Sequence, residues 1–339
     1  MVAMRKIFFL LISVFILALA LVACDRDFSD KEGDELAMLE AWVQVNGIPT
    51  ESLKPSGLYF VNQQEGTGLS PSEGDFVIYS YKEKSLDGIV LSTNDSATAV
   101  LYGEYNVNVH YSQLFTKYDK SNSTVEGYQR EMVKGVYEGL GYMKEGGKAM
   151  LIMPSKLAYG KRSVSYTSSV IRPYQSLVYE VELHKVVKNP REYELQLLHD
   201  YMNLHYPGLA PVNDSIYYIQ LSPPTNDTVT LAKDSVAYVY YKGMLLDGYM
   251  FDSNIDSVAT RLGRSFSSTD SLKVTVGTGV IKGFSQALVL MKKGEWGRVI
   301  MPSYCGYDSV GSTTIPPYSP LIFDLYFSSK SVVTKPQSK

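Results

Sequence analysis

The chain has 339 residues, of which 45% are hydrophobic, and a formal net charge of −3 at pH 7. This length favours two domains, and the hydrophobic content is ample for packed cores. The slightly acidic balance argues against a nucleic-acid partner, because phosphate binding needs clustered positive charge. Tyrosine is unusually common, with 27 residues against 12 Phe and 2 Trp. Such rings suit contact with peptides or sugars, but most of them can equally well fill strands.

The N-terminal segment, residues 1–23, is predicted to be a targeting signal. Arg5 and Lys6 precede an apolar run, which ends in Leu-Val-Ala directly before Cys24. This ending resembles the cleavage site of bacterial lipoproteins, which implies acyl chains on Cys24 and firm attachment to a bilayer. We therefore expect a bacterial cell-envelope protein, anchored to a membrane by lipid, with the outer membrane favoured. The alternative is an ordinary signal peptide or an uncleaved anchor, with Cys24 incidental.

The remaining charged and sulfur-bearing residues give few chemical signals. Residues 24–33 are polar and charge-dense, which predicts a flexible tether. After acylation only Cys305 remains, so we expect no intrachain disulfide, and no basic neighbour marks this thiol as reactive. The four histidines lack metal-ligand spacing, so we expect neither a metal nor a cofactor.

From residue 34 onward the chain contains one unit twice, over 34–188 and 190–330. Apolar residues at helical spacing predict a helix over 34–45 and another over 191–204, each followed by the start of a strand. Further along, the two copies share Met-Lys-Glu/Lys-Gly (143–146 and 291–294), Ile-Met-Pro-Ser (152–155 and 300–303), and the pair Tyr159 and Tyr307. This pattern indicates a tandem duplication with its boundary at Asn189-Pro190, and each copy has enough apolar residues for its own core.

The second unit carries four separated motifs. These are Leu-Asp-Gly-Tyr-Met-Phe-Asp-Ser-Asn (246–254), Val-Gly-Thr-Gly-Val-Ile-Lys-Gly-Phe (276–284), Val-Ile-Met-Pro-Ser-Tyr-Cys-Gly-Tyr (299–307) and Ile-Pro-Pro-Tyr-Ser-Pro-Leu-Ile-Phe-Asp-Leu (315–325). In this order they resemble the FKBP family of peptidyl-prolyl isomerases. The resemblance implies an α+β fold of two tandem FKBP-like domains. Each is an antiparallel twisted sheet wrapped around a short helix (about 135–143 and 283–291) and preceded by a helix. Periodicity alone predicts only a β-rich chain with a few helices.

The resemblance also implies a pocket in the second unit. Its aromatic walls would be Tyr241, Phe251, Phe284 and Phe323, and Val280 and Ile281 would bind the peptide. Asp252 would be its carboxylate, Tyr307 would supply its tyrosine hydroxyl, and Ile315 would form its apolar lip. Phe284 stands where the family usually has Trp, which implies a roomier floor. The loop 308–314 is short and polar compared with the family's Gly-rich one, so substrate preference is expected to differ.

Isomerisation of an X-Pro bond needs no nucleophile, metal or general base. The barrier of about 18–20 kcal/mol is the loss of amide resonance on twisting about the C–N bond. Because the planar amide is the more charge-separated form, water stabilises it more than the twisted one. A pocket that strips water from the proline and its preceding carbonyl is therefore expected to lower the barrier.

The first unit is predicted to have a degenerate site. It retains Tyr81 and Tyr159, and Tyr179 replaces the terminal Phe, so these three are candidate substrate-binding residues. However, Leu91-Ser92 stands where Phe-Asp is expected, and Val136 occupies the floor position. Loss of the carboxylate and of two aromatic walls predicts that this unit binds or spaces rather than catalyses.

Asp followed by Ser or Thr and an apolar residue recurs along the chain, for example at 95–97 and 270–272. The pattern resembles the O-glycosylation motif of exported Bacteroidetes proteins, but it is also ordinary turn chemistry.

The expected function is a lipid-anchored peptidyl-prolyl isomerase that acts on proline-containing segments and assists the folding of exported proteins, mainly through its second unit. One alternative is a non-catalytic FKBP-like peptide-binding or chaperone lipoprotein. Another is a surface lipoprotein whose tyrosines capture glycans.

Overall fold

The computed structural model describes residues 30–120, 132–213, 216–266 and 270–328. The predicted signal segment, the lipid site at Cys24 and most of the predicted tether lie outside these residues. The first helix, α2 (Lys31–Val45), starts three residues earlier than 34, so the end of the predicted tether is helical. Asp30 accounts for this early start, because its carboxylate accepts a hydrogen bond from the Gly33 N–H at 2.8 Å and caps the helix.

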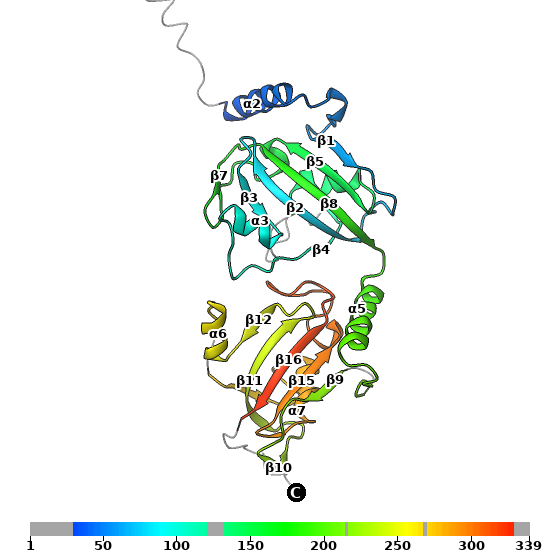
Figure 1. Ribbon diagram of the computed structural model, residues 1–339, viewed down its shortest axis with the longest axis vertical. Coiled ribbons are helices and arrows are strands. Elements are labelled where there is room, and N and C mark those ends of the chain that lie inside the picture. The colour runs from blue at the N-terminus through cyan, green and yellow to red at the C-terminus, as the bar shows by residue number, and fades with distance from the viewer. Residues whose placement is uncertain (1–29, 121–131, 214–215, 267–269, 329–339) are drawn as a thin grey trace, which may run out of the picture.

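Two β-rich units follow one another along the molecule, and helix α5 (Pro190–His205) leads from the first to the second (Figure 1). The α5 N-terminus is defined by Asn189, whose side chain accepts from the Glu192 N–H, and by Pro190 in the first turn. Helix α2 packs Leu39 and Val43 on the first sheet, and α5 packs Leu198 and Met202 on the second.

The two main sheets have the same antiparallel strand order, which confirms the duplication. The first runs β1-β5-β8-β2-β3 with β4 on β2, and the second runs β9-β15-β16-β11-β12 with β13 on β11. The first sheet contains β1 (Tyr59–Gln64), β2 (Phe76–Ser85), β3 (Val90–Thr93), β4 (Leu114–Lys117), β5 (Gly147–Met153) and β8 (Leu177–Val187). The second contains β9 (Tyr217–Gln220), β11 (Val236–Leu245), β12 (Met250–Ser253), β13 (Leu272–Thr275), β15 (Trp296–Met301) and β16 (Leu321–Phe327).

Each sheet packs one short helix against its inner face, close to where the sequence predicts it. These helices are α4 (Lys134–Gly141) and α7 (Lys282–Leu288). Helix α7 buries Phe284, Ala287 and Leu288, at the i, i+3, i+4 spacing of one helix face, in the core of the second unit. This α+β architecture of two similar domains is the predicted fold class.

Several small elements were not predicted. They are the helices α3 (Ser96–Leu101) and α6 (Asp256–Leu262), the strand pairs β6 (Val164–Ser165) with β7 (Val170–Ile171) and β10 (Asn226–Thr230) with β14 (Lys292–Lys293), and the 3-10 turns η1 (Thr50–Ser52), η3 (Ser155–Leu157) and η4 (Ser303–Cys305). They are too short to give a clear periodic signal in the sequence.

A buried glutamate joins each leading helix to its sheet. Glu194 on α5 is fully buried and accepts hydrogen bonds from both the N–H and the hydroxyl of Ser303. Glu35 on α2 accepts the same pair from Ser155, with the hydroxyl at 2.6 Å. Buried carboxylates are uncommon unless paired, so these bonds fix each helix on the loop that follows β5 or β15.

Replacement of Glu194 by Ala should therefore destabilise the protein. We expect a loss of about 2–4 kcal/mol in the free energy of unfolding, because the buried N–H and hydroxyl of Ser303 lose their acceptor. Urea denaturation gives this value, with Gln196→Ala, an exposed change on the same helix, as the control. Equal stability of the two variants would show that the buried carboxylate does not hold the helix.

Candidate functional site

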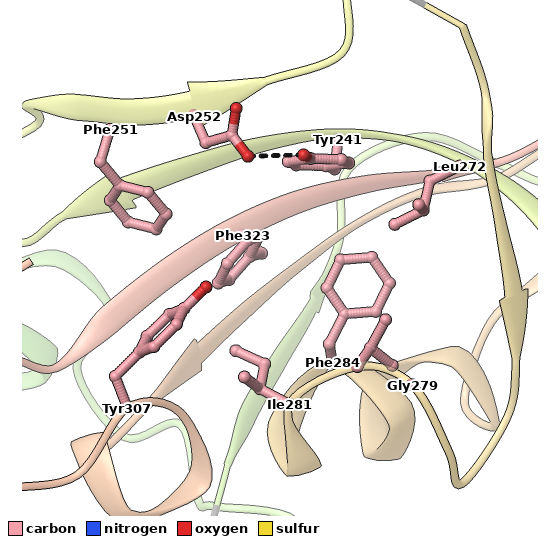
Figure 2. Close-up of a pocket in the computed structure, with 10 residues that line it drawn as sticks. Tyr241, Phe251, Asp252, Leu272, Gly279, Ile281, Phe284, Tyr307 and Phe323 are labelled. Atoms are coloured by element: carbon pink, nitrogen blue, oxygen red, sulfur yellow. Dashed lines mark hydrogen bonds between the residues drawn. The ribbon is translucent and has the colours of Figure 1, made fainter. Parts of the chain in front are cut away.

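The second unit contains a cavity of about 490 Å³ between α7 and the inner face of its sheet. Figure 2 shows its residues, which point toward a common hollow from β11, β12, β13, β16, α7 and the loops around them. The lining consists of Tyr241, Phe251, Asp252, Leu272, Gly279, Val280, Ile281, Phe284, Tyr307 and Phe323. Eight of the nine residues that the sequence places in this pocket are among them.

The ninth residue, Ile315, is placed differently. Its side chain is only 2% exposed and packs in the core of the second unit, and it is not among the lining residues. An apolar side chain before a Pro-Pro turn can face either the pocket or the core, so the sequence alone does not tell which of the two Ile315 faces. Conversely, Leu272 on β13 and Gly279 line the cavity although neither was predicted from the sequence.

Strand register brings the rings of Phe251 and Phe323 together. On the central pair, β11 and β16, Gly243 lies opposite Phe323, and on the other side of β11 it lies opposite Asp252. The β11–β12 register shifts between Gly243 and Met244, so Phe251 is the extra residue of a β-bulge. A bulge bends the strand and redirects side chains, which accounts for the two successive residues Phe251 and Asp252 both lining the cavity.

Gly243 makes this arrangement possible, and its role was not predicted from the sequence. A Cβ at this position would lie 2.5 Å from Cε2 of Phe251 and 3.0 Å from Cε1 of Phe323. Any side chain here would displace the two rings. A difference between the two units points to this position. Where the second unit has Gly243, the first unit has Glu83, which lies opposite Ser92 at the same register position.

Phe323 is the centre of the aromatic cup. Its ring centroid lies 5.5 Å from that of Phe284, 5.6 Å from that of Phe251 and 6.2 Å from that of Tyr241. The first two pairs meet edge to face, at 73° and 77°. Edge-to-face pairs of this kind stabilise one another beyond their buried area, so the rings form a fixed apolar wall.

The polar groups of the pocket are few and oriented. Asp252 accepts a hydrogen bond from the Tyr241 hydroxyl at 2.6 Å and one from the Ser253 N–H at 2.9 Å. The Tyr307 hydroxyl points into the hollow in the direction of Phe323 (Figure 2). Burial, followed by the negative charge of Asp252, raises the pKa of Tyr307 above its ordinary value. Burial and the bond to Asp252 raise the pKa of Tyr241 further.

These shifts predict how the site depends on pH. A raised pKa keeps a hydroxyl protonated to higher pH, so both tyrosines remain donors throughout the neutral range. Any turnover of a proline-containing peptide in this pocket is therefore expected to stay constant from about pH 6 to about pH 9, since an ordinary tyrosine titrates near 10. A pH–rate profile checks this, and loss of activity with an apparent pKa inside that window would contradict the assignment of neutral donors.

Asn254 holds the end of β12 in place. Its side chain is 2% exposed, accepts from the Tyr241 N–H at 2.7 Å and donates to the carbonyls of Val239 and Asp270. Asn94 makes the equivalent bonds in the first unit, where it accepts from the Tyr81 N–H. This pair of asparagines was not predicted from the sequence, although their matched positions in the two copies were a usable signal.

Among the described residues of the first unit, no comparable cavity lies at the corresponding place. Tyr81, Tyr159 and Tyr179, the predicted substrate-binding residues, surround only about 10 Å³, room for about one water molecule. Their hydroxyls bond to one another and to neighbours: Tyr81 to Ser92 at 3.0 Å, and Tyr159 to Tyr179 at 3.3 Å. These contacts occupy the three hydroxyls and leave little space beside them, and the assignment of Tyr81, Tyr159 and Tyr179 to substrate binding stays a prediction.

The physical cause is Glu83. Its side chain is 1% exposed and accepts hydrogen bonds from Tyr179 at 2.6 Å and from Tyr166 at 2.8 Å. It lies at the register position of Gly243, so it fills the space that the glycine leaves to the Phe251 ring in the second unit. A buried carboxylate needs such donors, and supplying them draws the tyrosines inward.

Within the four described ranges, no group of three or more His, Cys, Asp or Glu side chains is placed to bind a metal ion. Over the same residues, no helix combines the length and the apolar character that a membrane span requires.

A family model described as FKBP-type peptidyl-prolyl cis-trans isomerase matches residues 68–184 and 228–327. The human peptidyl-prolyl cis-trans isomerase FKBP9 is 28% identical over 230 residues, which cover 65% of this chain and 34% of that protein. FkpA, an FKBP-type isomerase of Escherichia coli strain K12, is 27% identical over 167 residues, which cover 49% of this chain and 50% of that protein. The chain thus spans about a third to a half of the length of these curated relatives.

Solved structures of similar proteins include two bacterial ones. The crystal structure of FkpA from E. coli is 24% identical, with a TM-score of 0.33 and with 54% of this chain and 71% of that chain covered. The structure of a peptidyl-prolyl isomerase from Pseudomonas syringae pv. tomato is 26% identical, with a TM-score of 0.35. The match covers 44% of this chain and 99% of that chain.

Proposed function

Because the chain belongs to the family of FKBP-type peptidyl-prolyl cis-trans isomerases, we propose that its second unit catalyses isomerisation of X-Pro peptide bonds. The observation that supports this most is the ring-lined cavity of about 490 Å³. Its size falls within the range of about 300–1,000 Å³ that is usual for sites binding small ligands. Phe251, Phe284 and Phe323 offer an apolar surface for the proline ring.

The proposed mechanism is desolvation of the prolyl amide. Twisting the C–N bond removes the resonance that separates charge in the planar amide, so the twisted form needs less solvation. A peptide seated against the aromatic cup loses water from the proline and the preceding carbonyl, which favours the twisted form. The Tyr307 hydroxyl, neutral and aimed into the hollow, is the donor that would hold a peptide carbonyl in register.

Asp252 has a positioning part in this scheme. It carries the hydrogen bond from Tyr241 at 2.6 Å, and so it fixes the Tyr241 ring as one wall of the cup. Because its other carboxylate oxygen accepts from the Ser253 N–H, its own orientation is also fixed. Asp252 therefore transfers no proton in the proposed mechanism.

An isomerisation assay on an X-Pro peptide with the full chain tests the proposal. Uncatalysed exchange takes about 10–100 s, so even modest acceleration is visible. We expect clear acceleration by the wild-type chain and a loss of about tenfold or more for Asp252→Ala and Tyr307→Phe, each of which removes one oriented polar group. The matched first-unit variants, Ser92→Ala and Tyr159→Phe, should change the rate less than about twofold.

The main alternative is a non-catalytic peptide-binding lipoprotein. The closed site of the first unit favours the absence of catalysis in that unit alone, since about 10 Å³ leaves no room for a prolyl ring. A folded wild-type chain that binds the peptide without accelerating exchange would favour the alternative for the whole protein.

We also propose that the protein is anchored by lipid at Cys24 in a bacterial cell envelope, where it assists the folding of exported proteins. The sequence of residues 1–24 supports this, because a basic start and an apolar run end at a cysteine. Growth with an alkyne-tagged fatty acid should label the wild-type chain and not Cys24→Ser. Equal labelling of both would contradict the anchor.

A further inference from the structure

Arg191 connects the helix between the units to the loop that carries Tyr307. It lies in the first turn of α5, and its guanidinium donates to Glu194 Oε2 at 2.5 Å, to Ser303 Oγ at 2.8 Å and to Asp308. The same group lies over the rings of Tyr304 and Tyr318, at 5.4 and 5.0 Å from their centroids. A guanidinium with several bonds and two stacked rings is well fixed, because its planar fork matches such partners.

The residues that Arg191 binds lie on both sides of Tyr307 in the chain. Ser303 stands four residues before it and Asp308 directly after it. The backbone closes the turn around them, since Asp308 N–H donates to the Ser303 carbonyl and the Asp308 carbonyl accepts from the Tyr318 N–H, both at 2.8 Å. Fixing Ser303 and Asp308 therefore fixes the backbone from which the Tyr307 side chain enters the pocket.

The turn at Asp308 is one that a non-glycine residue adopts at a cost. Asp308 has φ +50°, in the left-handed region. In the first unit the corresponding residue is Gly160, with φ +61°, and glycine takes this conformation freely. There Glu32 occupies the position of Arg191, so the first unit makes the same turn without an arginine. The second unit combines the strained residue with the cation that holds it.

We infer that Arg191 is a positioning residue of the second unit: from the linking helix it fixes the turn at Asp308 and thereby the Tyr307 hydroxyl in the pocket. This inference rests on the proposed function, since it concerns how a peptide carbonyl is held there. Tyr318, which Arg191 covers, also meets Phe76 of the first unit edge to face at 5.5 Å. The loop is thus supported from the linking helix and from the neighbouring unit together.

The test is a double-variant cycle in the full chain. We expect Arg191→Gln to lower kcat/KM about tenfold, since small displacements of a positioning group cost up to about a hundredfold. If Arg191 acts through the Tyr307 hydroxyl, the double variant Arg191→Gln, Tyr307→Phe should be within about twofold of Tyr307→Phe alone. Asp308→Gly in the Arg191→Gln background should restore most of the activity, because the turn then needs no cation. The control is Arg172→Gln in the corresponding loop of the first unit.

Two results would overturn the inference while leaving the proposed function standing: an active wild-type chain with unchanged Arg191→Gln, or losses from Arg191→Gln and Tyr307→Phe that multiply. If Arg191→Gln does not fold, Asp308→Asn removes the ion pair between Arg191 and Asp308 from its more exposed partner. We then expect the same loss of kcat/KM, about tenfold. A folded wild-type chain with no isomerase activity would instead contradict the proposed function itself. In that case, peptide affinity replaces kcat/KM in the same cycle.

Discussion

Gly243→Ala is expected to lower isomerase activity of the full chain about tenfold to a hundredfold. The added Cβ would lie 2.5 Å from Cε2 and 2.7 Å from Cζ of Phe251, and 3.0 Å from Cε1 of Phe323. Both rings are held in a closely packed core, so one of them must move into the cavity. Overpacking of this kind destabilises a fold by about 1–3 kcal/mol. Here the displaced ring would also narrow the substrate pocket.

The measurement is kcat/KM on an X-Pro peptide, with the melting temperature as a check on folding. The matched control is Glu83→Ala, which changes the same register position of the first unit and should leave activity unaltered. A folded Gly243→Ala protein with wild-type activity would mean that substrate does not use the space beside Phe251.

An exchange of site residues between the two units is expected to have a similarly large effect on isomerase activity. Replacing Phe251-Asp252 by Leu-Ser gives the second unit the residues of the first at these positions. We expect a loss of about a hundredfold or more, because a cup wall and the anchor of the Tyr241 hydroxyl disappear together. The same assay measures it.

The reciprocal exchange provides the control. Leu91→Phe with Ser92→Asp in the first unit should not create activity, because Glu83 still occupies the space that the new ring needs. Only with Glu83→Gly added should a cavity open, detectable as peptide binding in a chain whose second site carries Leu-Ser. Activity gained without the Glu83 change would show that this glutamate does not close the site.

The sequence predicted the duplication because matching segments recur in the same order in both units. Most of the pocket was predicted through the resemblance of the second unit to the FKBP family. The pair Phe251-Asp252 and the tyrosine at 307 were assigned through that resemblance. Leading helices were likewise visible in apolar spacing, apart from the three residues of α2 that Asp30 caps.

Features that depend on contacts across strands were not predicted. The role of Gly243 and the closing role of Glu83 follow from which residues lie opposite them on neighbouring strands, and local sequence does not contain that register. Glu35 and Glu194 look like ordinary exposed helix residues until the loop that covers them is placed. For Ile315, an apolar side chain alone does not distinguish a pocket lip from the core.

Methyl NMR on the full chain, titrated with an X-Pro peptide, tests the central claim most directly. Ile281 lines the second-unit pocket, and Val133 and Val136 border the closed site of the first unit. If the peptide binds where we propose, the methyl signals of Val280 and Ile281 shift with added peptide, while those of Val133 and Val136 stay in place. Shifts at Val133 and Val136, with Val280 and Ile281 unchanged, would contradict the account.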